Sequence, residues 1–111
     1  MRYTRTHEWV DLHEGVATTG LCDAAIAGIG NVTSMQLPEE GTDIIIGEEV
    51  GLLESNKSAI ELYAPLSGRV LERAADIKDL KWLYRIKISD KAEYDSLLTK
   101  EQYEKEIFGE T

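Results

Sequence analysis

The fold is decided by one stretch of sequence, Val50-Gly51-Leu52-Leu53-Glu54-Ser55-Asn56-Lys57-Ser58-Ala59-Ile60-Glu61-Leu62-Tyr63. Two short apolar runs flank the polar pair Asn56-Lys57, which is the pattern of a β-hairpin with that pair as its turn. The opposed pairs are then Ser55–Ser58, Glu54–Ala59, Leu53–Ile60 and Gly51–Leu62. Because side chains alternate along a strand, one face of this hairpin is mostly apolar and the other is mixed. The apolar face packs on a core, so the tip with Lys57 points into solvent.

A lysine in a turn is most often only a solvated charge. Here its neighbours Ser55, Asn56 and Ser58 are small and uncharged, so a modifying enzyme can approach the tip from either side. The hairpin also leads directly into a Pro/Gly turn, residues 64–68, before another strand. These two features favour a lysine that is presented for modification.

The lysine with the Ala-Pro-x-Ser-Gly turn that follows it resembles the carrier lysine of biotinyl and lipoyl domains. Biotin carriers usually place methionine on both sides of this lysine, and here Asn56 and Ser58 stand there. The chain more closely resembles the glycine cleavage H-protein family. The motifs that carry this resemblance are Glu54-Ser55-x-Lys57, Tyr63-Ala64-Pro65-Leu66-Ser67-Gly68, Thr6-His7-Glu8-Trp9-Val10, Gly20-x-x-Asp23-x-Ala25 and Leu37-Pro38-x-x-Gly41.

The resemblance implies a lipoyl group joined by an amide to Lys57, at a site flanked by Glu54, Ser55, Asn56 and Ser58. It also implies a non-catalytic carrier that shuttles an aminomethyl group between glycine decarboxylase, which uses pyridoxal phosphate, and an aminomethyltransferase. Dihydrolipoyl dehydrogenase would reoxidise the carrier, and a lipoate ligase or lipoyl transferase would attach the group. We expect a monomer.

Two other functions remain open at this stage. H-like proteins also act as stand-alone lipoyl relays that deliver lipoate or serve redox or sulfur chemistry outside glycine cleavage. A domain that keeps the fold and has lost the cofactor is a third possibility, and the intact Glu54-Ser55-x-Lys57 motif argues against it.

The pattern predicts a mainly β fold over residues 1–111, a single domain of two packed antiparallel sheets. The other strands are predicted at residues 6–10, 16–20, 32–37, 42–46, 69–73 and 82–88, with a turn at 11–15. One short helix begins with Asp23 as its N-cap and stops at Gly30, and Ile26 and Ile29 lie on its buried side. Two carboxyl-terminal helices are indicated by the capping pairs Asp90/Glu93 and Thr99/Gln102. The side chains expected to be mostly buried are Leu53, Ile60, Leu62, Val70 and Trp82.

Two segments depart from the family pattern. The helix carries the small residues Ala24, Ala27 and Gly28 (with Ile26) where the family usually has larger or polar ones. The connection at residues 74–81 is also much shorter than the family's loop. Since both segments shelter the loaded arm in the family, the resemblance implies a more exposed arm here.

Composition narrows the function classes further. Twelve basic and twenty-one acidic residues give a formal net charge of −9, which argues against nucleic acid and anionic membranes as partners.

The single cysteine, Cys22, excludes an internal disulfide, and it is either a nucleophile near a helix start or a small packed residue. His7 and His13 lack metal-ligand spacing. With no apolar segment of signal-peptide or membrane-spanning length, we expect a cytoplasmic protein.

Overall fold

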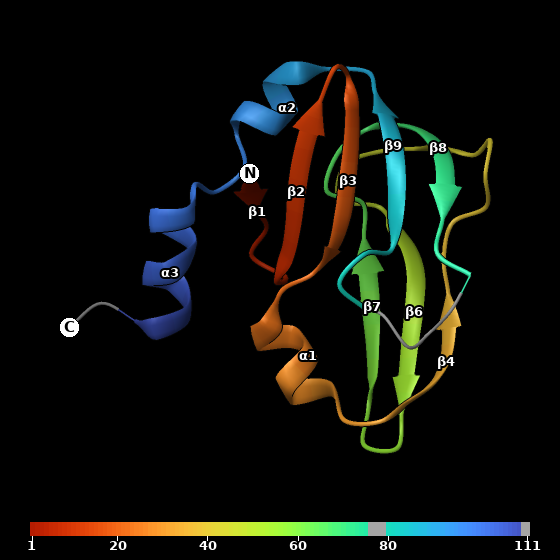
Figure 1. Cartoon of the computed structure of the whole chain (residues 1–111), viewed down its shortest axis with the longest axis vertical. Coiled ribbons are helices and arrows are strands. Elements are labelled where there is room, and N and C mark those ends of the chain that lie inside the picture. Colours follow the sequence, from red (N-terminus) through yellow and green to blue (C-terminus); the bar gives the residue numbers. More distant parts are fainter. Residues whose placement is uncertain (76–79, 110–111) are drawn as a thin grey trace.

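The computed structural model describes residues 1–75 and 80–109 and consists of two antiparallel sheets with three helices (Figure 1). The larger sheet has the order β1 (Arg2–Tyr3), β2 (Glu8–His13), β3 (Val16–Leu21), β9 (Tyr84–Ile88), β8 (Gly68–Arg73) and β5 (Asp43–Ile44). The smaller sheet has the order β4 (Val32–Gln36), β6 (Glu49–Ser55) and β7 (Ala59–Tyr63). The predicted mainly β fold of two antiparallel sheets is therefore confirmed. Four residues of the predicted short connection, 76–79, lie outside the described residues.

The β6–β7 hairpin has the predicted register. Leu53 pairs with Ile60, Gly51 pairs with Leu62, and Glu54 pairs with Ala59. The pairing shifts between Glu49 and Gly51, which is a bulge that the pattern did not predict.

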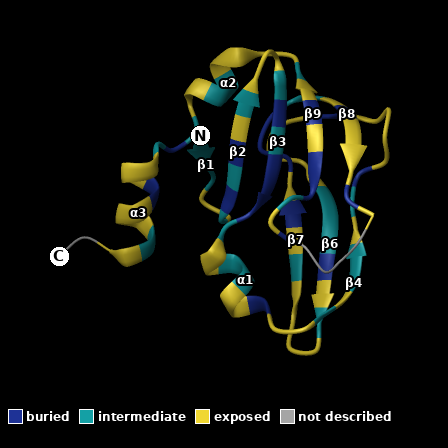
Figure 2. Ribbon diagram, in the orientation of Figure 1, coloured by how far each residue is buried: buried dark blue, intermediate teal, exposed yellow. Residues whose placement is uncertain are grey.

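One hydrophobic core is formed by residues of both sheets, and Figure 2 shows buried positions on strands of each. Leu53, Leu62 and Val70 are buried as predicted, whereas Ile60 and Trp82 are only half-buried. Trp82 is still more buried than exposed, but it lies outside the last strand, because β9 begins at Tyr84, two residues later than predicted. Leu83 and Tyr84 take the buried positions. The Arg85 guanidinium lies over the Trp82 ring, with its Cζ 5.5 Å from the ring centroid.

Two strand boundaries also differ from the prediction. β2 continues to His13, so the turn before β3 consists only of Glu14 and Gly15, whose φ angles are 49° and 80°. Two successive positive φ angles are typical of a tight hairpin turn, which leaves residues 11–13 free to pair with β3. β5 is limited to two residues, because the chain turns at Ile45 and Ile46 and leaves both side chains exposed.

The helix α1 (Asp23–Ile29) begins one residue earlier than predicted. Cys22 has the extended backbone of an N-cap, and its carbonyl accepts hydrogen bonds from the backbone N–H groups of Ala25 and Ile26. Asp23 is therefore the first helical residue and makes no capping hydrogen bond, although its charge suits the first turn. Gly30 ends the helix with a φ of 84°, as predicted, and Ile29 is buried while Ile26 is half-buried.

The two carboxyl-terminal helices are α2 (Lys91–Asp95) and α3 (Lys100–Phe108). Asp90 caps α2 through the Ala92 N–H, but Glu93 does not close a capping box. Its carboxylate instead accepts hydrogen bonds from the Ser67 N–H (2.8 Å) and hydroxyl (2.9 Å), which fastens α2 to the turn before β8. The Thr99–Gln102 capping box of α3 is present as predicted. No helix within residues 1–75 and 80–109 has the length and apolar character needed to cross a membrane.

Candidate functional site

The tip of the β6–β7 hairpin is closed by the side chain of Ser55. The Ser55 hydroxyl oxygen accepts hydrogen bonds from the N–H groups of Lys57 and Ser58, each at 3.1 Å. The Ser55 N–H also donates to the Ser58 carbonyl at 2.8 Å. A serine that bonds to backbone groups two and three residues ahead fixes a turn locally. The tip therefore holds its shape without any contact from the Lys57 side chain.

The end of α1 lies directly beside this tip. Asn56 Oδ1 accepts a hydrogen bond from the Asn31 N–H at 3.0 Å, and the Asn56 N–H donates to the Asn31 carbonyl at 3.1 Å. At Gly30, an added Cβ would lie 2.9 Å from Asn56 Oδ1 and 3.2 Å from Lys57 Cδ. The aliphatic part of the Lys57 side chain therefore runs over the exposed backbone at the end of α1.

The Lys57 amine is available for chemistry. Lys57 is exposed, and no residue in the described part of the chain forms a hydrogen bond or an ion pair with its amine. Of the residues predicted to flank it, Asn56 and Ser58 are exposed, Ser55 is half-buried within the turn, and Glu54 is exposed at the end of β6. All five predicted site residues thus lie together on one hairpin end. An exposed, unpaired primary amine on a fixed turn is suited to forming an amide with a carboxylic acid.

A buried carboxyl group, that of Glu8, lies at the start of β2. Glu8 is 4% exposed, and its Oε1 accepts hydrogen bonds from the hydroxyls of Thr4 and Thr6, both at 2.9 Å. Burial raises the pKa of Glu8 above its usual value, and the two hydroxyls partly oppose this shift. The Tyr84 hydroxyl is also buried and lacks a hydrogen-bond partner among the described residues. Its pKa is raised, first by burial and then by the charge of Glu8.

Comparison with known proteins identifies the family. The Glycine cleavage H-protein family matches residues 1–109 of the chain. The chain belongs to the glycine cleavage H-protein family. This family is a carrier component of the glycine cleavage system and carries lipoate, so the chain is a lipoyl carrier of H-protein type.

Individual H proteins agree with this assignment over nearly the whole chain. The glycine cleavage system H protein of Alcanivorax borkumensis is 36% identical, with 99% of this chain and 94% of the relative aligned. That of Thermotoga maritima is 38% identical, with 93% of this chain and 92% of the relative aligned. The crystal structure of a glycine cleavage system H protein from Mycobacterium marinum superposes with a TM-score of 0.78 at 28% identity, covering 96% of this chain and 95% of the other.

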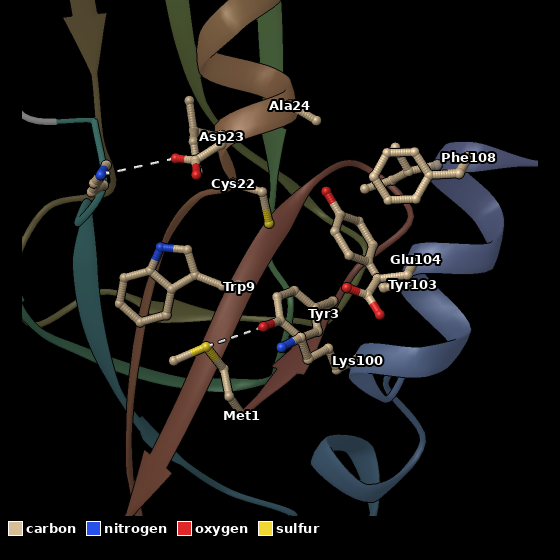
Figure 3. Close-up of a pocket in the computed structure, with 13 residues that line it drawn as sticks. Met1, Tyr3, Trp9, Cys22, Asp23, Ala24, Lys100, Tyr103, Glu104 and Phe108 are labelled. Atoms are coloured by element: carbon tan, nitrogen blue, oxygen red, sulfur yellow. Dashed lines mark hydrogen bonds and ion pairs between the residues drawn. The ribbon is translucent and has the colours of Figure 1, made fainter.

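A concavity of about 720 Å³ lies at the start of α1, between α1, β2 and α3 (Figure 3). The hairpin tip with Lys57 contacts the other end of this helix. Cys22 lines it, and Figure 3 shows the sulfur directed toward Tyr103. Burial raises the pKa of the Cys22 thiol, so the reactive thiolate is disfavoured. This supports the packed-residue interpretation of Cys22 over the nucleophile. The other lining residues are Met1, Tyr3, Trp9, Leu21, Asp23, Ala24, Lys81, Lys100, Glu104, Ile107 and Phe108.

Neither histidine of this H protein belongs to a metal site in the described residues. His7 Nδ1 lies 3.0 Å from the Tyr103 hydroxyl, and His13 is an exposed residue 3.9 Å from a Glu14 carboxylate oxygen. No group of three potential ligands from His, Cys, Asp and Glu occurs within residues 1–75 and 80–109.

Sequence reasoning missed the contact between Asn31 and Asn56, which lie 25 positions apart. The signal for it is weak: a Gly-Asn pair directly after a helix indicates only that the helix ends there. The burial of Glu8 could not be predicted either, since no local pattern indicates that a glutamate at a strand start will be buried.

Proposed function

We propose that Lys57 is the residue that carries lipoate in this H protein, through an amide between its amine and the lipoyl carboxyl group. The single observation that carries this proposal is the exposed, unpaired amine at the tip of a hairpin closed by Ser55. The surroundings fit the group, because neutralising the amine breaks no ion pair within the described residues and makes the net charge of −9 one unit more negative.

In this role the protein is a non-catalytic carrier. When bound, lipoate supplies a dithiolane whose sulfur takes up an aminomethyl group. The protein keeps the attachment point rigid and extended from the domain, so that the tethered group reaches each partner at a high effective concentration. The partners are glycine decarboxylase, which uses pyridoxal phosphate, the aminomethyltransferase and dihydrolipoyl dehydrogenase. A lipoate ligase or lipoyl transferase modifies the lysine, and the carrier acts as a monomer.

The acidic surface supports repeated encounters with several enzymes. Glu54 and Glu61 are exposed on the outer face of the β6–β7 hairpin, close in sequence to Lys57. Exposed charges of one sign raise the rate of encounter with a complementary surface more than they strengthen the complex. A carrier that must dissociate after each transfer benefits from this kind of recognition.

A stand-alone lipoyl relay is the second candidate, and the outer face of α1 favours it. Ala24 and Ala27 are exposed, and an added Cβ at Gly28 would meet no atom within 4 Å. A helix with so little side-chain bulk offers a loaded arm little shelter from water. A relay that hands on lipoate or performs redox chemistry does not need that shelter.

The test is modification with a lipoate ligase and lipoate, followed by intact-mass measurement and peptide mapping. We expect a single lipoyl adduct on Lys57, no adduct on Lys57→Arg, and a normal adduct on Lys87→Arg, which changes an exposed lysine of β9. Arginine preserves the charge but is not acylated as the lysine amine is. An adduct on Lys57→Arg, or an unmodified parent protein, would overturn the proposal.

A further inference from the structure

We propose that the end of α1 is part of the lipoylation site, with Asn56 as a positioning residue and Gly30 as the surface on which the Lys57 side chain lies. This inference rests on the proposed function of Lys57 as the acylated residue. It means that the modifying enzyme meets a folded surface made from two segments, rather than the hairpin sequence alone.

The Asn56 side chain is not needed to form the turn. Ser55 already closes the tip through its hydroxyl, which accepts the N–H groups of Lys57 and Ser58. The Asn56 amide instead reaches out of the hairpin and accepts the Asn31 N–H at 3.0 Å. Its backbone N–H returns a second hydrogen bond to the Asn31 carbonyl at 3.1 Å. Asn56 therefore joins two elements, and the residue next to it in the chain is the lysine.

Gly30 makes room for the lysine in this arrangement. Its φ of 84° is unfavourable for residues with a side chain, and a Cβ there would lie 2.9 Å from Asn56 Oδ1. The same Cβ would lie 3.2 Å from Lys57 Cδ and 3.3 Å from Lys57 Cγ, so the lysine side chain would have to shift. Only glycine lets the aliphatic part of Lys57 rest against the backbone of the helix end while Asn56 keeps its hydrogen bonds.

These contacts restrict the directions in which the Lys57 amine can point. With the stem lying across Gly30, the lysine is held to one side of the hairpin, as the placement of α1 beside the hairpin tip in Figure 1 indicates. An enzyme that brings an activated acyl group to this amine gains when the amine is already oriented, because misplaced reacting atoms slow a transfer step. The partner class is thus an acyl-transferring enzyme that recognises a folded surface.

The test compares ligase kinetics for the parent, Asn56→Ala, Asn56→Asp and Thr33→Ala. The alanine variant removes the acceptor for the Asn31 N–H, and the aspartate variant keeps an acceptor at the same place. Thr33→Ala is the matched control, because the Thr33 hydroxyl donates its hydrogen bond to the Glu54 carbonyl of β6 and not to Asn31 or Lys57. We expect kcat/KM for lipoylation to fall roughly 2- to 10-fold in Asn56→Ala, the effect of losing one such hydrogen bond, and to recover in Asn56→Asp.

Two further measurements separate positioning from a merely structural role. Acetylation of Lys57 by acetic anhydride should proceed equally in all four proteins, because the amine stays exposed. Hydrogen exchange of the Asn31 amide should quicken in Asn56→Ala but not in Thr33→Ala. Equal kcat/KM values for Asn56→Ala and Thr33→Ala, or unchanged exchange at Asn31, would overturn this inference and leave Lys57 as the attachment site. A parent protein that accepts no lipoate on Lys57 would overturn the proposed function, and this inference with it.

Discussion

The charge state of Glu8 affects the stability of the folded protein, since its carboxyl group is buried and accepts hydrogen bonds from Thr4 and Thr6. Its pKa in the folded state lies above the usual 4.5 because burial penalises the ionised form. The folded state then binds the proton more tightly than the unfolded chain does. The contribution of Glu8 to stability is therefore fully present below pH 4.5 and is lost as the pH rises through its folded pKa.

The variant Glu8→Gln tests this pH dependence. Glutamine stays neutral and keeps a carbonyl oxygen for the two threonine hydroxyls. The free energy of unfolding of the variant should therefore rise relative to that of the parent as the pH increases from 4.5 through the raised folded pKa of Glu8. Denaturant titrations at a series of pH values measure this difference, with Glu54→Gln as the exposed control. A difference that stays constant across this range would contradict the assignment.

At single residues, the sequence predicts what depends on near neighbours. The place of Lys57 follows from the alternation of apolar residues on either side of it, and the structure has that register. The contact of Asn56 with Asn31 could not be predicted, because it depends on how α1 lies against the hairpin. The burial of Glu8 depends likewise on the packing of distant segments.

At the scale of single elements, β7 contributes to the core through Leu62, which is 1% exposed. Leu62→Ala should lower the free energy of unfolding by about 2–5 kcal/mol, through lost burial and the cavity left behind. Glu61→Ala is the matched control on the same strand, because Glu61 is exposed and should change stability little. Chemical denaturation and thermal melting measure both variants. An unchanged melting temperature for Leu62→Ala would contradict the packing of this strand.

The attachment of α3 depends on its first turn and on one side chain. Thr99 accepts the Gln102 N–H at 3.2 Å, and Tyr103 stacks on Tyr3 with ring centroids 4.8 Å apart. Thr99→Ala should destabilise α3 by about 0.5–2 kcal/mol, because its capping hydrogen bond is lost. Hydrogen exchange of the Tyr103 amide should quicken accordingly, while Thr42→Ala, which changes an exposed loop hydroxyl, leaves it unchanged. Equal exchange in both variants would show that the cap contributes nothing.

Element boundaries show where local patterns stop being sufficient. The capping box of α3 was predictable because all its partners lie within four residues. Glu93 has the same spacing from Asp90, but it binds Ser67, 26 positions away, and so leaves its box open. Ile45 and Ile46 look like strand residues, yet β5 pairs with β8 only through Asp43 and Ile44. For Glu93 a tertiary contact decided against the local pattern, and for Ile45 and Ile46 a turn of the chain did.

At the scale of the whole molecule, the lysine lies at one end and α2 at the other. Figure 1 shows the hairpin tip below α1 and α2 beyond the opposite ends of the strands. A protein that approaches the Lys57 end would therefore not meet α2. The surface that it would meet beside the arm is the outer face of α1.

That outer face should control how long an aminomethyl group survives on the arm. Ala24 and Ala27 are exposed, and open space surrounds Gly28, so water has free access along the helix. A reactive group is protected from hydrolysis when side chains exclude water around it. Adding bulk with Ala27→Leu should then slow the loss of the group from lipoylated, loaded protein in the absence of a transferase. Ala92→Leu adds the same bulk on α2, at the far end of the molecule, and should leave the lifetime unchanged. If both variants lose the aminomethyl group as fast as the parent does, side chains on the outer face of α1 do not control its lifetime. The small residues there would then not favour a relay over a glycine cleavage carrier.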